Sequence, residues 1–222
     1  MKERKKSPLK NMTFKEKVDH IWEYYRIHIL VSAMVLFFVG SMLNHLVFNP
    51  PKDAGIYVAF LGRFMDMEEI EDLQDRLTEE IVKDETEKTE GKVEFFMLDY
   101  DRVEMAEMNM VTVQKLMAMF TSKEIDIMIA DPANFHAYVQ QQAFIPLTEV
   151  FTEEELKPWE EYWFMTKGET DTEPQLYGLS IEGNQIIEKV RFIDERPIIG
   201  VISNTTRMDK SKETIQWFME QQ

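Results

Sequence analysis

The feature that most constrains this chain is an apolar run over residues 28–48, which contains no Asp, Glu, Lys or Arg. Its length is about what an α-helix needs to cross roughly 30 Å of hydrocarbon. A cleaved signal peptide would have a shorter apolar region of about 7–15 residues and a small-residue cleavage site, and no such site follows here. Asn44 and His45 lie near the outer end, where the membrane interface tolerates polar groups. We therefore predict a transmembrane helix over 28–48 rather than a buried core helix.

The segment before this run, residues 1–27, is basic and has a helical apolar pattern. It contains eight Lys or Arg and four Asp or Glu, so its net charge is +4. An apolar stripe recurs at helical spacing in Phe14, Val18, Ile21, Trp22 and Tyr25. This pattern predicts an amphipathic juxtamembrane helix, with Trp22, Tyr24 and Tyr25 at the membrane interface. Because cationic residues favour the cytoplasmic side, we expect a single-pass cell-membrane protein of bacterial type, with its N-terminus inside and its C-terminal domain outside.

The chain beyond the apolar run is strongly acidic. The whole chain carries a net charge of -16, the first 27 residues carry +4 and residues 28–48 carry none, so the remainder carries -20. Such a surface repels nucleic acid, which excludes nucleic-acid partners. The sequence has no cysteine, which excludes disulfides, thiolate metal sites and thiol catalysis. No cofactor is expected.

Residues 53–222 alternate between strand and helix patterns. Strands are expected over 54–60, 92–98, 125–130, 175–181 and 197–203, of which the first and the last read as buried. Residues 186–193 suggest an antiparallel strand, or one half of a hairpin with the next strand. Helices are expected after Asp66 (with Glu69 completing a capping box), over 103–120, after Asp131, after the capping box of Thr152 and Glu155, and after Asp209. This order predicts an α/β fold: one three-layer α/β/α lobe with a mostly parallel sheet and at least one antiparallel strand.

Three segments carry a resemblance to a known family. Residues 122–149 contain a strand ending in Asp131, then a helix and the sequence Ala-Phe-Ile-Pro-Leu; residues 176–180 read Leu-Tyr-Gly-Leu-Ser; residues 199–219 combine a strand with a helix. Together they resemble type 2 extracellular solute-binding proteins, with alanine at position 143 where that family prefers glycine. The resemblance implies an extracytoplasmic α/β lobe.

The chain differs from that family in size. A complete solute-binding protein has two lobes that close on the ligand by hinge motion, whereas residues 53–222 suffice for about one lobe. We therefore expect a non-enzymatic, membrane-anchored binding module, which serves as an accessory or partner-binding subunit of a membrane assembly such as a transporter. Its partners would be membrane lipid, through residues 28–48, and another membrane protein. The alternative is a receptor or sensor for a cationic solute or metal ion; whether a small molecule binds stays open.

Polar residues follow the first three predicted strands. In an open α/β sheet, ligands bind outside the carboxyl ends of the strands, so we expect a ligand-binding site there. Its candidate residues are Arg63, Asp99, Asp101, Asp131 and Asn134. Carboxylates in such a position suit a hard cation or a basic ligand. The alternative is that the aspartates only cap or begin helices.

An aromatic group, Trp159, Tyr162, Trp163 and Phe164, is the second candidate site. These residues either cover an open end of the sheet or form a partner-binding surface, since Trp and Tyr are frequent anchors at interfaces. Methionines at 105, 108, 110, 117 and 119 suit core packing better than a copper site. The four histidines are scattered, and no hydrolase, zinc-protease or nucleotide-binding motif occurs, so no catalytic residue is expected.

Overall fold

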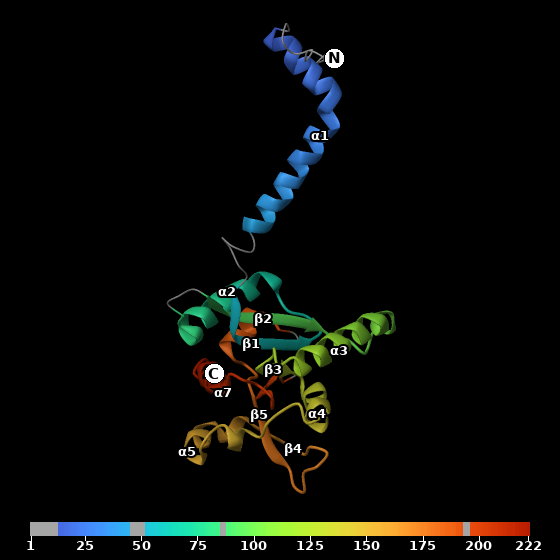
Figure 1. Cartoon of the computed structure of the whole chain (residues 1–222). Coiled ribbons are helices and arrows are strands. Elements are labelled where there is room, and N and C mark those ends of the chain that lie inside the picture. Colours follow the sequence, from blue (N-terminus) through green and yellow to red (C-terminus); the bar gives the residue numbers. More distant parts are fainter. Residues whose placement is uncertain (1–12, 45–51, 85–87, 193–195) are drawn as a thin grey trace. The chain divides into compact units, whose positions relative to one another are not determined.

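The structure, a computed structural model, describes residues 13–44, 52–84, 88–192 and 196–222. It divides into two compact units, Met1–Pro51 and Lys52–Gln222. Among the described residues, the first unit consists of one long helix, and the second contains a sheet with helices packed against it (Figure 1).

The first unit is the continuous helix α1, Phe14–Leu43. Its stretch Trp22–Leu43 is long and apolar enough to cross a membrane, and none of it is buried in the protein. Leu36 and Phe37, for example, expose 71% and 72% of their surface. The stretch begins earlier than the predicted 28–48, and the predicted interfacial residues Trp22, Tyr24 and Tyr25 belong to the same helix. Residues 1–12 of the predicted tail and 45–48 of the predicted span lie outside the described residues.

The second unit contains a six-stranded mixed sheet. Its strands are β1 (Asp53–Gly62), β2 (Thr89–Met97), β3 (Ile127–Ala130), β4 (Trp163–Thr166), β5 (Gln175–Ser180) and β6 (Ile198–Val201), in the order β2-β1-β3-β6-β5-β4. The pairs β1–β2 and β1–β3 are parallel, whereas β3–β6, β5–β6 and β4–β5 are antiparallel. The α/β class is confirmed.

The helices begin and end where the local chemistry satisfies their terminal amides. They are α2 (Met67–Leu77, continued by the π-helix Thr78–Val82), the short 3-10 turn Val103–Met105 with α3 (Ala106–Thr121), α4 (Pro132–Gln140), the 3-10 turn Leu147–Glu149, α5 (Glu153–Leu156, continued by the 3-10 segment Lys157–Tyr162), α6 (Gln185–Lys189) and α7 (Met208–Met219). Asp131 caps α4 as predicted, by accepting hydrogen bonds from the amides of Ala133 and Asn134. Thr152 and Glu155 form the predicted capping box.

Three local predictions are wrong. Residues 186–192 do not form a strand: the Asn184 side chain accepts a hydrogen bond from the Ile186 amide and so caps the short helix α6, while residue 193 of the predicted strand lies outside the described residues. Asp209 is not a cap but lies in the first turn of α7, which Arg207 precedes. Glu69 does not complete a capping box with Asp66: the Asp66 side chain caps α2 by accepting from the Glu68 amide, and Glu69 pairs with Lys189 at 3.6 Å.

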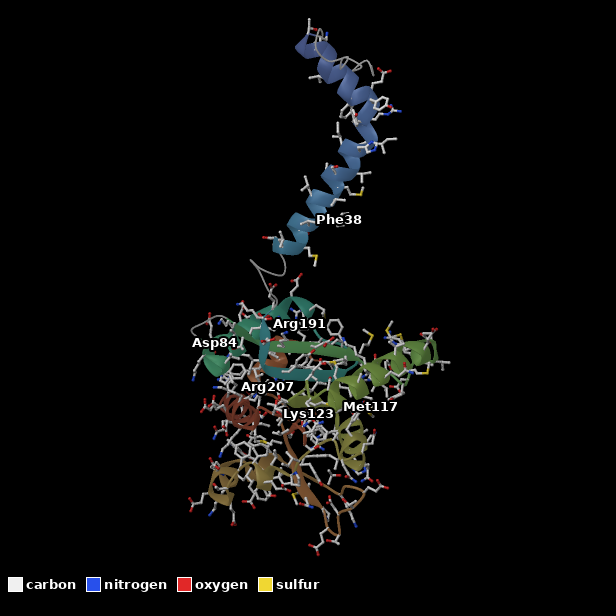
Figure 2. The ribbon with its side chains drawn as sticks, in the orientation of Figure 1. Phe38, Asp84, Met117, Lys123, Arg191 and Arg207 are labelled. Carbon is white, nitrogen blue, oxygen red and sulfur yellow. The ribbon has the colours of Figure 1, made fainter. Side chains whose placement is uncertain are left out.

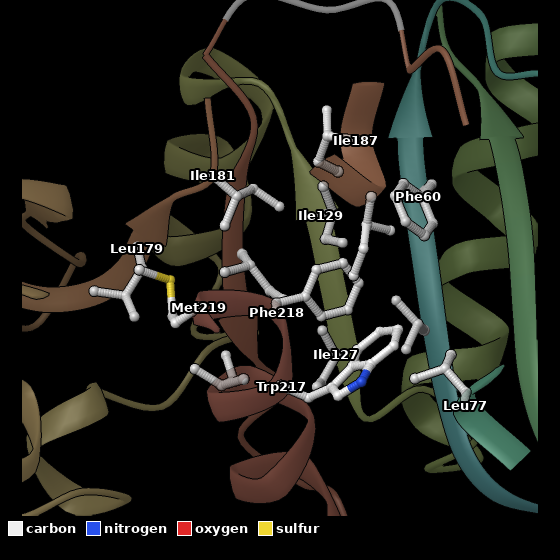
Figure 3. Packing of buried hydrophobic residues seen from close by; sticks show 14 of the residues in the cluster. Phe60, Leu77, Ile127, Ile129, Leu179, Ile181, Ile187, Trp217, Phe218 and Met219 are labelled. Atoms are coloured by element: carbon white, nitrogen blue, oxygen red, sulfur yellow. The ribbon is translucent and has the colours of Figure 1, made fainter. Parts of the chain in front are cut away.

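The core consists of two apolar clusters, and alternate residues of β1 belong to different ones. Ile56, Val58 and Phe60 join the cluster that contains apolar side chains of α2, α6 and α7. Figure 3 shows Phe218 of α7 lying against Ile127 and Ile129 of β3 in this cluster. The intervening residues, such as Ala59, join the cluster formed with α3 and α4. Because successive side chains of a strand point to opposite faces, the clusters lie on opposite faces. All members of both clusters belong to the second unit, which therefore has a complete core of its own.

Two glycines allow α4 to pack closely on the sheet. Phe135 of α4 is fully buried. A Cβ atom on Gly200 of β6 would lie 2.6 Å from the Phe135 ring, and one on Gly178 of β5 would lie 2.8 Å from it. Phe135 also stacks on Phe144 with 4.1 Å between the ring centroids. Because these two positions have no Cβ atom, the Phe135 ring can pack directly on the sheet. This contact positions α4 and its N-terminus over the sheet.

Candidate functional site

Four of the six strands end at one edge of the sheet. The pairings of Ile198 with Ala130 and with Ser180 show that β3 and β5 run in the same direction, which β1 and β2 share. The chain passes from β1 through α2 to β2, then through α3 to β3, which lies on the other side of β1. The two connecting helices pack in opposite clusters. Since such a change in strand order opens a crevice at the carboxyl ends of the strands, we call this side of the sheet the carboxyl edge.

A cavity of about 410 Å³ lies at the carboxyl edge beside β1, β2 and β3. We call it the first cavity. It is lined by Arg63, Leu98, Asp99, Tyr100, Asp101, Asp131, Pro132, Ala133, Asn134 and Arg196. All five residues that the sequence indicated as ligand-binding therefore line one cavity, although they come from three separate segments of the chain.

Asp99 is the most buried acid of the first cavity and is only 8% exposed. The amide of Asp101 donates to its carboxylate at 3.1 Å, and the guanidinium of Arg102 lies 3.2 Å from the other carboxylate oxygen. The side chain of Asn109 accepts from the Asp99 amide at 3.1 Å and donates to the Asp99 carbonyl at 2.7 Å. The sequence did not indicate Arg102, which directly precedes the 3-10 turn Val103–Met105, or Asn109, which lies on α3.

The carboxylate of Asp131 caps the N-terminus of α4. One carboxylate oxygen accepts from the amides of Ala133 at 2.8 Å and Asn134 at 3.1 Å, while the Asn134 side-chain amide donates to the other oxygen. The capping alternative therefore describes this acid, and Asn134 supports the same cap. By contrast, Asp101 is exposed and lies 3.9 Å from the Arg63 guanidinium. Across the described ranges, no group of three or more His, Asp or Glu side chains is arranged to hold a metal ion.

A second cavity of about 470 Å³ adjoins the first. It is lined by Pro132, Glu161, Tyr162, Trp163, Phe164, Ser180, Glu182, Arg196 and Ile198. The two cavities share Pro132 and Arg196. The Arg196 guanidinium lies 3.4 Å from Glu182, and both side chains are largely exposed. The carboxyl edge therefore carries a continuous surface, with acidic and basic groups at one end and aromatic groups at the other.

The aromatic group is half-buried and lies at the start of β4. Trp159, Tyr162 and Trp163 pack against the cluster of α2 and α7, whereas Phe164 packs against the cluster of α3 and α4. The Trp163 indole donates to the carbonyl of Leu156 at 3.4 Å. These contacts fit the interpretation of the group as core cover. Tyr162, Trp163 and Phe164 also line the second cavity, whereas Trp159 does not.

Arg196, which lines both cavities, was not indicated as a site residue by the sequence. It lies just before β6, and β6 runs opposite to β3, so the beginning of β6 meets the ends of β1, β2 and β3. Its φ of 48° is in the left-handed region, which is uncommon for a residue with a side chain. The Arg-Pro sequence at 196–197 does not predict this position, because the position depends on the antiparallel pairing of β6 with β3.

The chain matches no protein-family model, no curated protein and no solved structure.

Proposed function

We propose that this chain is a membrane-anchored binding module of the cell surface, acting as an accessory or partner-binding subunit of a membrane assembly such as a transporter. One combination of features supports the proposal. The same chain carries a helix able to span a membrane and a folded unit whose carboxyl edge has two adjoining cavities. Its role is recognition and not catalysis.

The proposed orientation follows from charge. The N-terminal 27 residues carry +4, and the chain after the apolar run carries -20. Because Lys and Arg near a span are retained on the cytoplasmic side, α1 would cross the membrane with its N-terminus inside. The acidic unit would then lie outside the cell, which is the compartment implied by the resemblance to type 2 solute-binding proteins.

We further propose that the folded unit is a single three-layer α/β/α lobe of that solute-binding type. The apolar clusters on both faces of the sheet and the common direction of four strands support this arrangement. Residues Lys52–Gln222 form one compact unit. A hinged pair of lobes encloses its ligand, whereas a single lobe presents its cavities to whatever lies beside it. This favours a protein partner at the carboxyl edge.

The second cavity offers the chemistry of a protein interface. Tyr162, Trp163 and Phe164 provide apolar area with few rotatable bonds, and Glu161 and Arg196 provide polar groups at the same cavity. Aromatic residues and Arg are enriched in the central parts of protein interfaces. A partner that covers this cavity would also reach the first cavity through Arg196.

Site-specific photocrosslinking in intact cells tests this proposal. A photoreactive phenylalanine analogue replaces Glu161 at the second cavity, or Glu79, an exposed residue of the π-helix that follows α2, as the control. We expect one discrete crosslinked membrane protein from position 161, none from position 79, and loss of the product in an Arg196→Glu background. Equal products from both positions, or no product from position 161, would contradict the proposal.

A receptor for a cationic solute is the second candidate, favoured by the meeting of all five predicted ligand residues in the first cavity. Its test is thermal unfolding of the folded unit with arginine, spermidine or Mg²⁺. The triple variant Asp99→Asn, Asp101→Asn, Asp131→Asn should abolish ligand-dependent stabilisation, because Asn keeps the cap of α4. A variant of equal charge change on α2, Glu68→Gln, Glu71→Gln, Asp75→Asn, should retain it. Identical behaviour of the two variants would rule out this receptor function.

A further inference from the structure

Helix α3 carries a row of apolar residues that its own fold leaves exposed. Val103, Ala106, Met110, Val113 and Met117 follow one another at alternating spacings of three and four residues, and we call this row the α3 stripe. Val103 is 86% exposed, Met110 57% and Met117 37%, whereas Val113 is half-buried and packs against the cluster of α3 and α4. Methionine sulfurs gather along α3 in Figure 2, where Met117 is labelled. A 3-4 spacing places the residues on one side of a helix, as at a helix–helix contact.

The buried side of α3 is different from the stripe. It consists of Asn109, Leu116, Met119 and Phe120. In the first half of the helix only Asn109 is buried, and its side chain is used to hold Asp99. Packing within the unit therefore does not explain why the first half of the stripe is apolar. An exposed row of large apolar residues on a rigid helix is typical of a contact surface.

A hollow accompanies the stripe. A cavity of about 500 Å³ is lined by Tyr100, Arg102, Val103, Ala106, Asn109, Met110, Val113 and Gln114, so four residues of the stripe belong to it. Ala106, the smallest member, lies between Val103 and Met110. Met117 at the other end of the stripe lines a further cavity of about 220 Å³, between α3 and α4. Flexible methionines beside such hollows adapt to apolar side chains of different shape.

The acid beside the stripe is Glu107, which follows Val103 by four residues and precedes Met110 by three. It is exposed and forms no ion pair among the described residues. The nearby cations are engaged: Arg102 lies 3.2 Å from Asp99, and Lys115 pairs with Glu94. The chain after the apolar run carries -20 in total. A partner segment with the same acidic character, including a second copy of this unit, would be repelled here.

From these observations we infer that the α3 stripe is a docking surface for a basic amphipathic helix of a partner protein. The apolar face of that helix would lie along Val103, Ala106, Met110, Val113 and Met117, and its Lys or Arg side chains would face Glu107. Helix-in-groove recognition of this kind is read through anchors three and four residues apart. The inference does not depend on the proposed function of the carboxyl edge, because Tyr100 is the one residue lining both this hollow and the first cavity.

The test uses residues 52–222, whose core is complete without α1, so that the probe cannot partition into lipid or detergent. The probe is a fluorescent helical peptide with leucines at heptad spacing and lysines on its polar side, and the matched probe has glutamates in place of the lysines. Fluorescence anisotropy should show at least tenfold tighter binding of the lysine peptide, weakening as salt is raised from 50 to 300 mM because exposed charges are screened.

Variants of α3 locate the binding. Met110→Ser together with Met117→Ser should weaken binding of the lysine peptide at least tenfold. The matched control, Met108→Ser with Val111→Ser, changes two exposed apolar residues of α3 outside the stripe and should leave binding unchanged. Failure of the lysine peptide to bind, equal binding of both peptides, or equal effects of the two variants would overturn the inference. So would self-association of the unit in sedimentation equilibrium that the Met110→Ser, Met117→Ser variant abolishes, because the stripe would then serve a second copy.

Discussion

Asn109 holds the backbone of Asp99 from both directions: its side-chain oxygen accepts from the Asp99 amide at 3.1 Å, and its side-chain nitrogen donates to the Asp99 carbonyl at 2.7 Å. Both residues are buried. The pair fixes the turn after β2, and this turn supplies Asp99, Tyr100 and Asp101 to the first cavity. Asn109 was not among the predicted site residues and does not line the first cavity, yet it determines the geometry of the turn that does.

Removing this amide should destabilise the second unit. We predict that Asn109→Ala lowers the free energy of unfolding by about 2 kcal/mol, since two buried backbone groups lose their partners. Chemical denaturation of residues 52–222 measures the change. The control Gln114→Ala removes an exposed amide from the same helix and should change stability by less than about 0.5 kcal/mol. A loss of similar size in both variants would contradict the role given to Asn109.

A buried ion pair is the second testable feature. Asp126 is fully buried, and its carboxylate accepts from the Arg207 guanidinium at 2.8 Å, from the Tyr57 amide at 2.8 Å and from the Thr205 hydroxyl. Arg207→Met should cost about 3–5 kcal/mol at neutral pH, because it leaves a buried carboxylate without its cation. The second variant, Asp126→Asn with Arg207→Met, removes both charges and should recover part of this loss.

The pH dependence of that loss has a definite sign. Burial raises the pKa of the Asp126 carboxyl above its usual 3.8, against the opposing effects of Thr205 and Arg207. A raised folded-state pKa favours the protonated folded form, so this contribution to stability is present at low pH and is lost as the pH rises through the folded-state pKa. Without Arg207 the pKa should rise further. Arg207→Met should therefore be less destabilising at pH 4 than at pH 7, and a pH-independent loss would contradict this account.

The glycine at position 200 provides a packing test. A Cβ atom there would lie 2.6 Å from the Phe135 ring. We predict that Gly200→Ala destabilises the unit by about 1–3 kcal/mol, as overpacking does in a dense core. In the background of Phe135→Leu, which shortens the obstructing side chain, the same substitution should cost at least about 1 kcal/mol less. Additive effects in this double-mutant cycle would show that Phe135 is not the obstacle.

Glu155 connects α5 to α7 in a pH-dependent way. The hydrogen bond from Lys212, together with those from the amide and hydroxyl of Thr152, lowers the pKa of Glu155 from 4.5 to about 2. A lowered folded-state pKa contributes stability above the unfolded-state value, and this stability is lost as the pH falls from about 4.5 to about 2. Lys212→Met should raise the pKa of Glu155 toward 4.5. An NMR titration of the Glu155 carboxyl measures this directly, and an unchanged pKa would contradict the pairing.

The sequence predicted those elements whose signal is local. β1, β2, β3, β5 and β6 have runs of apolar residues bounded by turn signals, and Asp131 and Thr152 are recognisable caps. The predicted ligand residues came together because they follow consecutive parallel strands. Predicting these five residues required only the general rule that the carboxyl ends of parallel strands lie at the same edge of a sheet.

What could not be predicted depends on pairing between distant segments. The short strand β4 is recognisable only from its antiparallel pairing with β5, because Trp163–Thr166 has no strong alternation. Residues 186–193 are rich in isoleucine and therefore suggested a strand, but the Asn184 cap made the first part of them helical. Arg196 joins the two cavities only because β6 lies next to β3. These features depend on tertiary contacts, which a local sequence pattern does not specify.

Membrane topology decides whether the acidic unit lies outside the cell, and the absence of cysteine in the sequence makes it simple to measure. Single cysteines replace Thr13, which precedes α1, and Glu79 of the acidic unit; both positions are exposed. Intact cells are treated with a membrane-impermeant maleimide before and after permeabilisation. We expect labelling of Glu79→Cys in intact cells, and labelling of Thr13→Cys only after permeabilisation. Labelling of Thr13→Cys but not Glu79→Cys in intact cells would contradict an extracytoplasmic binding module.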